Sequence, residues 1–398
     1  MPWKEVDPMD QRRQFVADAR RCVGSWTELC ARYGISRKTG YKWLARAEAQ
    51  GSTGLTELSR RPRACPHATT PEVVAALLEA RRHHPYWGPR KLLRILRRHD
   101  PAATWPARST AADLLRRHGL ILPRPRRRRL GHSGRPTTPM TAPNEIWTAD
   151  FKGQFRTGDA RYCYPLTVAD GYSRFLLGCQ SLPHPTHALT QPVFERLFRE
   201  YGLPQLIRTD NGVPFATCAL GRLSALSVWW VRLGIFPELI EPASPQQNGR
   251  HERMHRTLKH ETARPPAGSL AAQQRRFNTF RTEFNHDRPH QALGDETPAS
   301  RYHPSPRPFP ARVPPLEYPS HFEIRLVSAN GGIRWQHQWV NVSHVLDGQY
   351  VGLEEVDDAE WDLYVGPLKL GRFHERLLRV EDTLGRLRRR RVLPMSPD

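Results

Sequence analysis

The sequence contains no run of about 18 apolar residues, so a membrane-spanning helix is not expected. No charged segment followed by an apolar stretch stands at its N-terminus, and we therefore expect a cytoplasmic location. Cysteine is sparse, and no two cysteines form a Cys-x-x-Cys pair. So few cysteines in a chain of 398 residues indicate reduced thiols rather than a disulfide framework or a structural zinc site.

Acidic residues are also in short supply, since 39 Asp and Glu face 61 Lys and Arg and the net charge is +22. The imbalance is concentrated before residue 150, where residues 1–149 hold 29 Lys and Arg but 12 Asp and Glu. Such a surplus makes nucleic acid the leading partner, because basic side chains neutralise phosphates and release counterions. A solvated basic surface or a membrane-surface patch is the alternative interpretation.

Residues 1–58 are expected to form a helix-turn-helix DNA-binding domain. Ser25 and Glu28 have the spacing of a capping box, and Gly34 makes a tight turn before Ser36, which caps the next helix. A basic helix after a short glycine turn is typical of a recognition helix in the major groove. Its outward side chains, and hence its expected DNA contacts, are Arg37, Lys38 and Lys42. An ordinary three-helix bundle with a basic face is the alternative.

A second helix-turn-helix-like domain is expected over residues 66–122. Pro71 and Glu72 suit the first turn of a helix, further helices follow from Tyr86 to His99 and from Ser109 or Thr110, and the last ends at Gly119. These helices contact DNA or only pack against the rest of the chain. A basic linker at 123–141 follows, which either lies along phosphates or is a solvated run of charge.

Residues 142–300 alternate between strand and helix patterns. Enrichment in β-branched and aromatic residues predicts strands at 146–155 and 162–170, and a third strand is expected at 175–181. The elements expected next are a helix at 189–201, a strand at 206–209, helical residues at 220–233, a strand at 236–240, a helix from Gln246 and a helix at 270–285. Three meandering strands followed by alternating helices and strands predict a mixed α/β sheet.

The C-terminal third begins with a Pro-rich linker at 301–319, which is expected to be extended. Five short strands are then expected at 322–327, 334–342, 349–355, 360–365 and 367–370, with a turn at Asn330-Gly331-Gly332. Five short strands within about fifty residues suggest a small β-barrel, which we assign to 320–375. A basic tail occupies 376–398.

Three carboxylates, each within a distinctive phrase, are the most informative feature of the chain. Asp150 lies within or at the end of an apolar strand, Asp210 ends another strand, and Glu252 lies in the first turns of a helix. The phrases are Trp147-Thr148-Ala149-Asp150-Phe151, Thr209-Asp210-Asn211-Gly212-Val213-Pro214-Phe215 and Gln247-Asn248-Gly249-Arg250-His251-Glu252-Arg253. Each phrase alone is weak, because Asp-Asn-Gly is usually a turn and a helical Glu is usually exposed. Together they can converge at one end of a sheet and hold Mg²⁺ or Mn²⁺ through oxygen ligands.

The helix that carries Glu252 also presents basic side chains near this carboxylate. His255 and Arg256 follow it at i+3 and i+4, and Lys259 follows about two turns later, on the same face. Basic groups beside a metal-binding Glu can hold DNA phosphates in register. Lys259 is one of seven Lys beside 54 Arg. It is either such a phosphate contact or a casual surface residue.

These phrases resemble those of bacterial insertion-sequence transposases of the Asp-Asp-Glu class, whose core is similar to that of retroviral integrases. The matching residues are Trp147, Asp150, Thr209, Asp210, Asn211, Gly212, Pro214, Phe215, Gln247, Asn248, Gly249, Glu252, Arg253, His255, Leu258 and Lys259. The match is specific over 142–300, whereas the flanking domains match only in architecture. Asp210 and Glu252 are 42 positions apart, several more than is usual in the family. We therefore expect an insertion near residues 216–233.

The resemblance implies a ribonuclease-H-like catalytic core with two Mg²⁺ or Mn²⁺ ions. Asp150 and Asp210 would share one ion, and Asp150 and Glu252 the other. Double-stranded DNA, both the element ends and the target, would be the substrate of a homo-multimer at the bacterial nucleoid. DNA contacts would involve Asn248, His255, Arg256 and Lys259. Two rival functions stay open: a non-catalytic DNA-binding repressor, against which the complete triad argues, and a nuclease for RNA–DNA hybrids, against which the duplex-reading helices argue.

Overall fold

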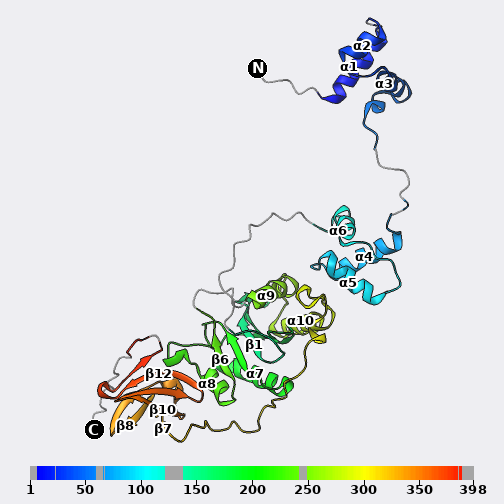
Figure 1. Cartoon of the computed structure of the whole chain (residues 1–398). Coiled ribbons are helices and arrows are strands. Elements are labelled where there is room, and N and C mark those ends of the chain that lie inside the picture. The colour runs from blue at the N-terminus through cyan, green and yellow to red at the C-terminus, as the bar shows by residue number, and fades with distance from the viewer. Residues whose placement is uncertain are drawn as a thin grey trace. The chain divides into compact units, whose positions relative to one another are not determined.

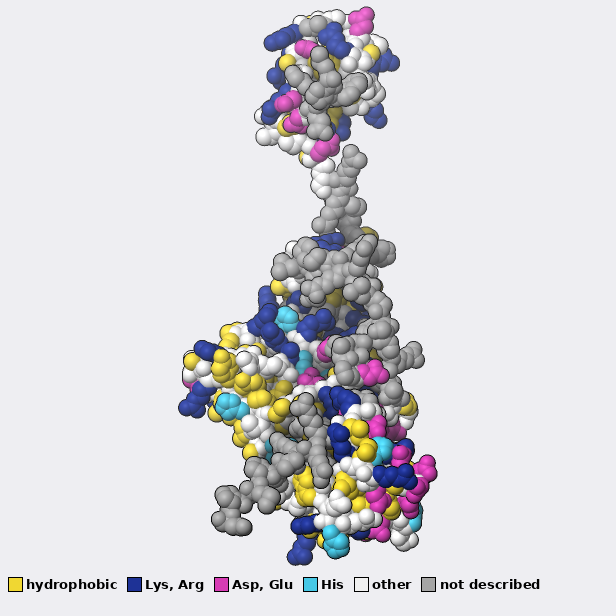
Figure 2. Space-filling model, turned by 90° about the vertical axis from the view of Figure 1, so that its left-hand side faces the viewer, with side chains coloured by type: hydrophobic (Ala, Val, Ile, Leu, Met, Phe, Trp, Pro, Cys, Tyr) yellow, Lys and Arg dark blue, Asp and Glu magenta, His cyan; other side chains and the backbone are white. Residues whose placement is uncertain are grey.

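The structure, a computed structural model, describes residues 7–22, 24–59, 66, 68–121, 138–241, 249–383 and 385–387 (Figure 1). The chain divides into two compact units, residues 1–69 and 70–398. None of the described helices is both long and apolar enough to cross a membrane. Lys and Arg side chains are exposed on both units (Figure 2). The expected basic linker falls largely outside the described residues, as does the basic tail beyond residue 387.

The first unit is a three-helix domain that follows the expected pattern. Ser25 and Glu28 form the predicted capping box, Gly34 adopts a φ of 61° in the turn, and Ser36 caps the third helix by accepting from Thr39 N. Phe15, Trp43 and other apolar side chains form its core. The helices are α1 (Pro8–Arg20), α2 (Trp26–Arg32) and α3 (Arg37–Gln50), followed by the 3₁₀ turn η1 (Gly51–Leu55).

The second unit begins with three further helices, which have their own apolar core around Leu77, Trp87 and Leu92. Helix α5 is strongly amphipathic, because its Leu and Ile residues recur at helical spacing between Arg residues. The helices are α4 (Pro71–His83), α5 (Pro89–His99) and α6 (Arg108–Arg117). Ion pairs connect this helical domain to the following domain, through His84 with Glu283 at 2.9 Å and Arg90 with Asp295 at 2.6 Å.

The central domain is built on a mixed sheet, as predicted. Strands β3 and β4 form an antiparallel meander beside β1, whereas β5 and β6 continue the sheet parallel to β1. Short β2 pairs with the beginning of β3. The strands are β1 (Ile146–Phe151), β2 (Phe155–Arg156), β3 (Tyr162–Asp170), β4 (Leu176–Leu182), β5 (Leu206–Thr209) and β6 (Phe236–Leu239).

Helices cover both faces of this sheet. On one face, Trp147 and Ala149 of β1 pack with residues of α7 and α8 in the largest core cluster. On the other face, side chains of α9 and α10 pack against Cys163, Leu176 and Cys179. Because side chains alternate along a strand, Thr148 and Asp150 point away from the first core. The helices are α7 (His187–Tyr201), α8 (Ala225–Arg232), α9 (Gly249–Thr262) and α10 (Leu270–Thr282), which continues into the π-helical turn η4 (Glu283–Asp287).

The C-terminal strands do not close into the expected barrel. Five of them form an open antiparallel sheet in the order β13-β12-β11-β10-β7, and a separate hairpin pairs β8 with β9. The segment expected as one strand at 334–342 is interrupted at Gln336 and His337, whose positive φ angles make the hairpin turn. The strands are β7 (Glu323–Leu326), β8 (Gly332–Trp335), β9 (Gln338–Asn341), β10 (Tyr350–Asp357), β11 (Glu360–Val365), β12 (Leu368–His374) and β13 (Arg379–Asp382).

The Pro-rich segment before these strands is extended, but it is fastened to the central domain. The backbone oxygen of Arg307 accepts a 2.7 Å hydrogen bond from Leu203 N. The Arg307 guanidinium donates to the backbone oxygens of Pro204, Leu233 and Gly234. Phe309 packs against the sheet core. This segment is therefore a strap along the domain surface rather than a free spacer.

Residues 216–233, where an insertion was expected, attach the central domain to the C-terminal sheet. The apolar core of the C-terminal sheet includes two leucines from the 3₁₀ turn η2 (Leu220–Arg222) and the residue after it, Leu220 and Leu223. It also includes Val228 and Val231 of α8. Trp230, on the opposite side of α8, is buried in the core of the central sheet. One short helix thus contributes to two cores.

Candidate active site

Asp150 and Asp210 are brought together by the register of two parallel strands. Ala149 of β1 is paired with Thr209 of β5, so the next residue of each strand, Asp150 and Asp210, lies at the same end of the sheet. Adjacent strands lie about 4.8 Å apart, so the two Asp residues are neighbours at this end of the sheet. Asp210 Oδ1 also accepts from Gly212 N at 3.2 Å, and Asn211 Nδ2 donates to the Ile240 backbone oxygen at 2.9 Å. These contacts fix the loop after β5.

Glu252 reaches the same place from α9. It lies in the first turn of that helix, which packs across the face of β1 that carries Thr148 and Asp150. Its side chain is exposed, whereas Asp150 is 18% exposed. The charges of Asp210 and Glu252 both act on Asp150. The three predicted carboxylates thus belong to neighbouring elements: β1, the loop after β5, and α9.

The electrostatics of Asp150 reflect this crowding. Burial is the largest cause that raises its pKa, and the negative charge of Asp210 is the second. Lys152 lowers the pKa and Glu252 raises it, and the net result is a pKa of about 7. A bound cation would relieve the repulsion that holds this pKa high.

Two buried histidines, at i and i+4 on α9, lie directly behind Asp150. His255 Nδ1 is 3.5 Å from Asp150 Oδ2, and His255 Nε2 is 2.6 Å from the Thr167 hydroxyl. His251 Nε2 contacts the same hydroxyl at 2.6 Å, and its Nδ1 contacts the Thr148 hydroxyl at 2.9 Å. Burial lowers the pKa of His251 to about 3 and also lowers that of His255, so both rings are neutral.

These groups form a buried polar cluster behind Asp150. The Thr148 hydroxyl donates to the Ala169 backbone oxygen at 3.2 Å, and the Thr167 hydroxyl donates to the Asp150 backbone oxygen at 3.1 Å. Each hydroxyl also contacts a ring nitrogen of the histidines. The cluster therefore fixes the backbone of Asp150 and places the His255 ring beside its carboxylate.

The same residues also have the composition of a mixed-ligand metal site. Ligand atoms of Asp150, His251 and His255 lie within 4.8 Å of one another. However, the Nε2 atoms of both rings converge on the Thr167 hydroxyl, and His251 Nδ1 is engaged by Thr148. These ring nitrogens, which could serve as ligands, therefore already have hydroxyl partners.

The predicted phosphate contacts on α9 fall into two groups. Arg256 and Lys259 are exposed, and Lys259 lines a small cavity together with Lys152, whose charge acts on Asp150. His255 differs from the expectation, because it is 3% exposed and points at the sheet rather than at solvent. Asn248 lies outside the described residues. Sequence reasoning also missed Thr148, Thr167 and His251, although His251 and His255 have the spacing of one helix face and Thr167 pairs with Asp150 in the sheet.

The expected DNA contacts in the first unit lie on the surface of α3. Arg37, Lys38 and Lys42 are all exposed, while Trp43 is buried between neighbouring cations. Tyr41 is 59% exposed on the same helix. An exposed basic and aromatic surface on the second helix of the motif is suited to contact with phosphates and base edges.

Models of known protein families match along most of the chain. A Helix-turn-helix domain matches residues 11–63 and a Homeodomain-like domain matches 39–115. Two models of the Integrase core domain match 140–245 and 233–298, and these ranges contain Asp150 and Asp210 in the first and Glu252 in the second. The chain therefore combines DNA-binding helix-turn-helix domains with an integrase core. The ribonuclease-H-like mixed α/β fold expected for that core is supported.

Individual relatives extend this result. The chain is 26% identical over 278 residues to the "Insertion element IS476 uncharacterized 39.2 kDa protein" of Xanthomonas euvesicatoria, over 67% of this chain and 75% of that protein. It is 30% identical over 117 residues to the Gag-Pol polyprotein of Baboon endogenous virus, 29% of this chain. The chain spans 6 to 19% of the length of the retroviral polyproteins that it matches. The HTLV-2 integrase catalytic core domain, solved in complex with magnesium, aligns with a TM-score of 0.33 at 18% identity, over 41% of this chain and 98% of that one. The resemblance to bacterial insertion-sequence transposases with an integrase-like core is confirmed.

Proposed function

We propose that this protein is a DNA transposase that cleaves the ends of its own insertion sequence and joins them to target DNA. The observation that carries the proposal is the parallel register of β1 and β5, which brings Asp150 and Asp210 to one end of the sheet, with α9 and its Glu252 packed on β1. The integrase core and helix-turn-helix matches support both the reaction class and a duplex DNA substrate. A location in the bacterial cytoplasm at the nucleoid follows from that substrate.

The donor set fits two divalent ions, Mg²⁺ or Mn²⁺. All three donors are carboxylates, and a cation would offset both the burial and the repulsion from Asp210 that raise the pKa of Asp150. Asp150 and Asp210 would hold one ion, and Asp150 and Glu252 the other. When bound, these ions supply activation of a water or a DNA 3′-hydroxyl and stabilisation of the leaving oxygen.

The remaining residues of the site bind and orient. The cluster of Thr148, Thr167, His251 and His255 supports Asp150 from behind, through the Asp150 backbone oxygen and the His255 ring beside its carboxylate. Arg256 and Lys259, exposed on α9, bind phosphates beside the scissile bond. Arg37, Lys38 and Lys42 of α3 contact the element's terminal repeats. Because two DNA ends must be joined in concert, we propose that a homo-multimer assembles on them.

Incubation of the purified full chain with labelled duplex that carries the element's ends tests this function directly. We expect nicked and joined products with Mg²⁺ and none with a chelator or with an unrelated duplex. Tight duplex binding without product at any divalent ion would favour the non-catalytic DNA-binding alternative. Cleavage of an RNA–DNA hybrid in place of duplex would favour the nuclease.

A further inference from the structure

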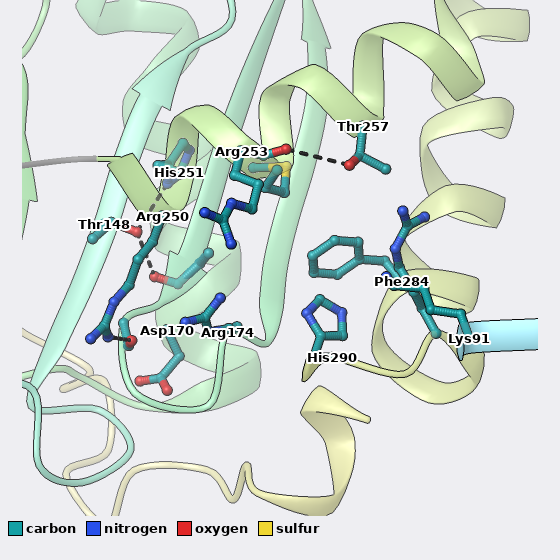
Figure 3. Close-up of a pocket in the computed structure, with 14 residues that line it drawn as sticks. Lys91, Thr148, Asp170, Arg174, Arg250, His251, Arg253, Thr257, Phe284 and His290 are labelled. Atoms are coloured by element: carbon teal, nitrogen blue, oxygen red, sulfur yellow. Dashed lines mark hydrogen bonds between the residues drawn. The ribbon is translucent and has the colours of Figure 1, made fainter. Parts of the chain in front are cut away.

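A basic cavity of about 100 Å³ lies beside a different face of α9 from the one that carries Glu252 (Figure 3). Arg250, Arg253 and Thr257 line it from α9, and successive helix residues are about 100° apart, so Glu252 points elsewhere. Figure 3 shows Arg174, Arg250 and Arg253 on one side of the cavity and His290, Phe284 and Lys91 on the other.

Positive charge dominates the cavity wall. Lys91, Arg174, Arg250, Arg253 and Arg288 line it, whereas Asp170 is its one acidic residue within the described part of the chain. Asp170 accepts hydrogen bonds from Asn144 N, Ser173 N and the Ser173 hydroxyl, so its charge is already engaged. Arg288 is paired with Glu261 at 2.7 Å. Neither Arg174 nor Arg253 forms an ion pair with any residue that the structure describes.

Two of these residues are in energetically unfavourable states: Arg174 through its backbone conformation and Lys91 through burial of its charge. Arg174 has a φ of 65°, a left-handed conformation that residues other than Gly, Asn and Asp rarely adopt. The turn that holds it there is closed by Arg174 N donating to the Asp170 oxygen at 3.0 Å. Lys91 reaches the cavity from α5, and burial, with the charge of Arg288 second, lowers its pKa to about 7.

A buried ring nitrogen also faces the cavity without a partner. His290 Nε2 is inaccessible to solvent and forms no hydrogen bond with the described residues. Burial and the charges of Lys91, Arg288 and Arg174 lower the pKa of this imidazole to about 3. An anion bound among these cations would offset the repulsion that contributes to the lowered pKa values of Lys91 and His290.

We propose that this cavity binds a phosphate group of the DNA backbone, with Arg174 and Arg253 as its principal donors. Planar guanidinium groups bind phosphate oxygens through paired, charge-assisted hydrogen bonds. Phe284 and Met254 form an apolar wall that suits the sugar carbons next to a phosphodiester. The choice of DNA over free phosphate rests on the proposed function.

A phosphate here would connect two parts of the second unit. Lys91 belongs to the helical domain and Arg174 to the turn between β3 and β4, so one anion would bridge them. Arg253 is adjacent to Glu252 on α9. A phosphate held by Arg253 therefore restrains the rotation of the helix that presents Glu252 to the other carboxylates.

The site is tested first with inorganic phosphate as the probe, by calorimetric titration of the full chain. Loss of a charge-assisted hydrogen-bond donor in Arg174→Gln should weaken phosphate binding roughly tenfold. Arg275→Gln, which changes an exposed residue of α10 outside the cavity, should leave the affinity unchanged. Equal affinity in wild type and Arg174→Gln would overturn the site. Glu252→Gln should bind phosphate like wild type, so a chain that binds phosphate but joins no DNA rejects the proposed function alone.

The source of the phosphate is tested by the salt dependence of binding to a duplex that carries the element's end. Removal of one phosphate contact should reduce the slope of log K against log salt by about 0.9 in Arg174→Gln. An unchanged slope, with weakened inorganic phosphate binding, would contradict the DNA assignment. Lys91→Met separates loss of binding from loss of folding. It should weaken phosphate binding without lowering the Tm of the free protein, because it removes a buried cation. A lower Tm with unaltered phosphate affinity would exclude Lys91 from the site.

Discussion

Replacement of Asp150 by Asn should stabilise the protein when no metal is present, and increasingly so as the pH rises. Asp150 is mostly buried, and the charge of Asp210 further raises its pKa from 3.8 to about 7. A carboxyl whose folded-state pKa is raised binds its proton more tightly when folded. Its ionisation therefore costs stability as the pH rises from the unfolded pKa to the folded one.

The size of the effect follows from the shift. One pKa unit corresponds to about 1.4 kcal/mol, so the ionised Asp150 opposes folding by about 4 kcal/mol above pH 7. Part of this cost is already present at pH 5, and the change between pH 5 and pH 8 is roughly 2 to 3 kcal/mol. Asp150→Asn does not carry this ionisation cost. The wild type should recover the lost stability when Mg²⁺ is added.

Hydrogen exchange of peptides that contain β1, measured in chelator at both pH values, reports the free energy of opening of this core. Arg275→Gln, at an exposed position of α10, is the matched control and should leave the opening of β1 unchanged at both pH values. If Asp150→Asn destabilises β1, or has the same effect at pH 5 and pH 8, the carboxylates do not crowd as described.

Three further outcomes are expected from the same geometry. Alanine at Arg37, Lys38 and Lys42 of the full chain should weaken binding to the element's ends and flatten its salt dependence by about 0.9 for each phosphate that is no longer neutralised; an unchanged slope would move the DNA-binding surface elsewhere. Lys259→Ala should reduce joined product while DNA binding persists, and Lys259→Arg should recover part of the loss; wild-type yield from Lys259→Ala would make it an ordinary surface residue. His255→Ala should raise the Mg²⁺ concentration needed for half-maximal joining, with partial rescue by His255→Gln, whose amide can still donate; equal Mg²⁺ requirements would remove its positioning role.

Much of the fold was predictable because local signals were strong. The capping box at Ser25, the cap at Ser36 and the β-branched and aromatic enrichment of β3 depend on short-range chemistry, and the structure matches them. Barrel closure depends instead on strand tilt and pairing across the whole sheet, which no local pattern encodes. The turn at Gln336 and His337 was missed because it contains no Gly, Asn, Asp or Pro to mark it. Strand β13 was missed because Val380 is its only apolar residue.

The candidate site was predictable to the level of residue types. Asp150 is the second-last residue of β1 and Asp210 directly follows β5, and the parallel register of these strands makes them neighbours. His255 shows where pattern reasoning ends. Its i+3 spacing from Glu252 fits either a solvent-facing or a sheet-facing position, and only the packing of α9 on β1 decides between them. The cavity around Arg174 likewise joins residues far apart in the chain.

The most direct test of the central claim is the yield of joined DNA from Asp150→Asn, Asp210→Asn and Glu252→Gln, each compared with wild type at saturating Mg²⁺. Binding to the element's ends is measured in parallel, because the helix-turn-helix surface is untouched. We expect joining to fall below detection in all three variants while the dissociation constant for the ends stays within about threefold, a difference under 1 kcal/mol. Full joining by any one of them would remove that carboxylate from the site and contradict the account.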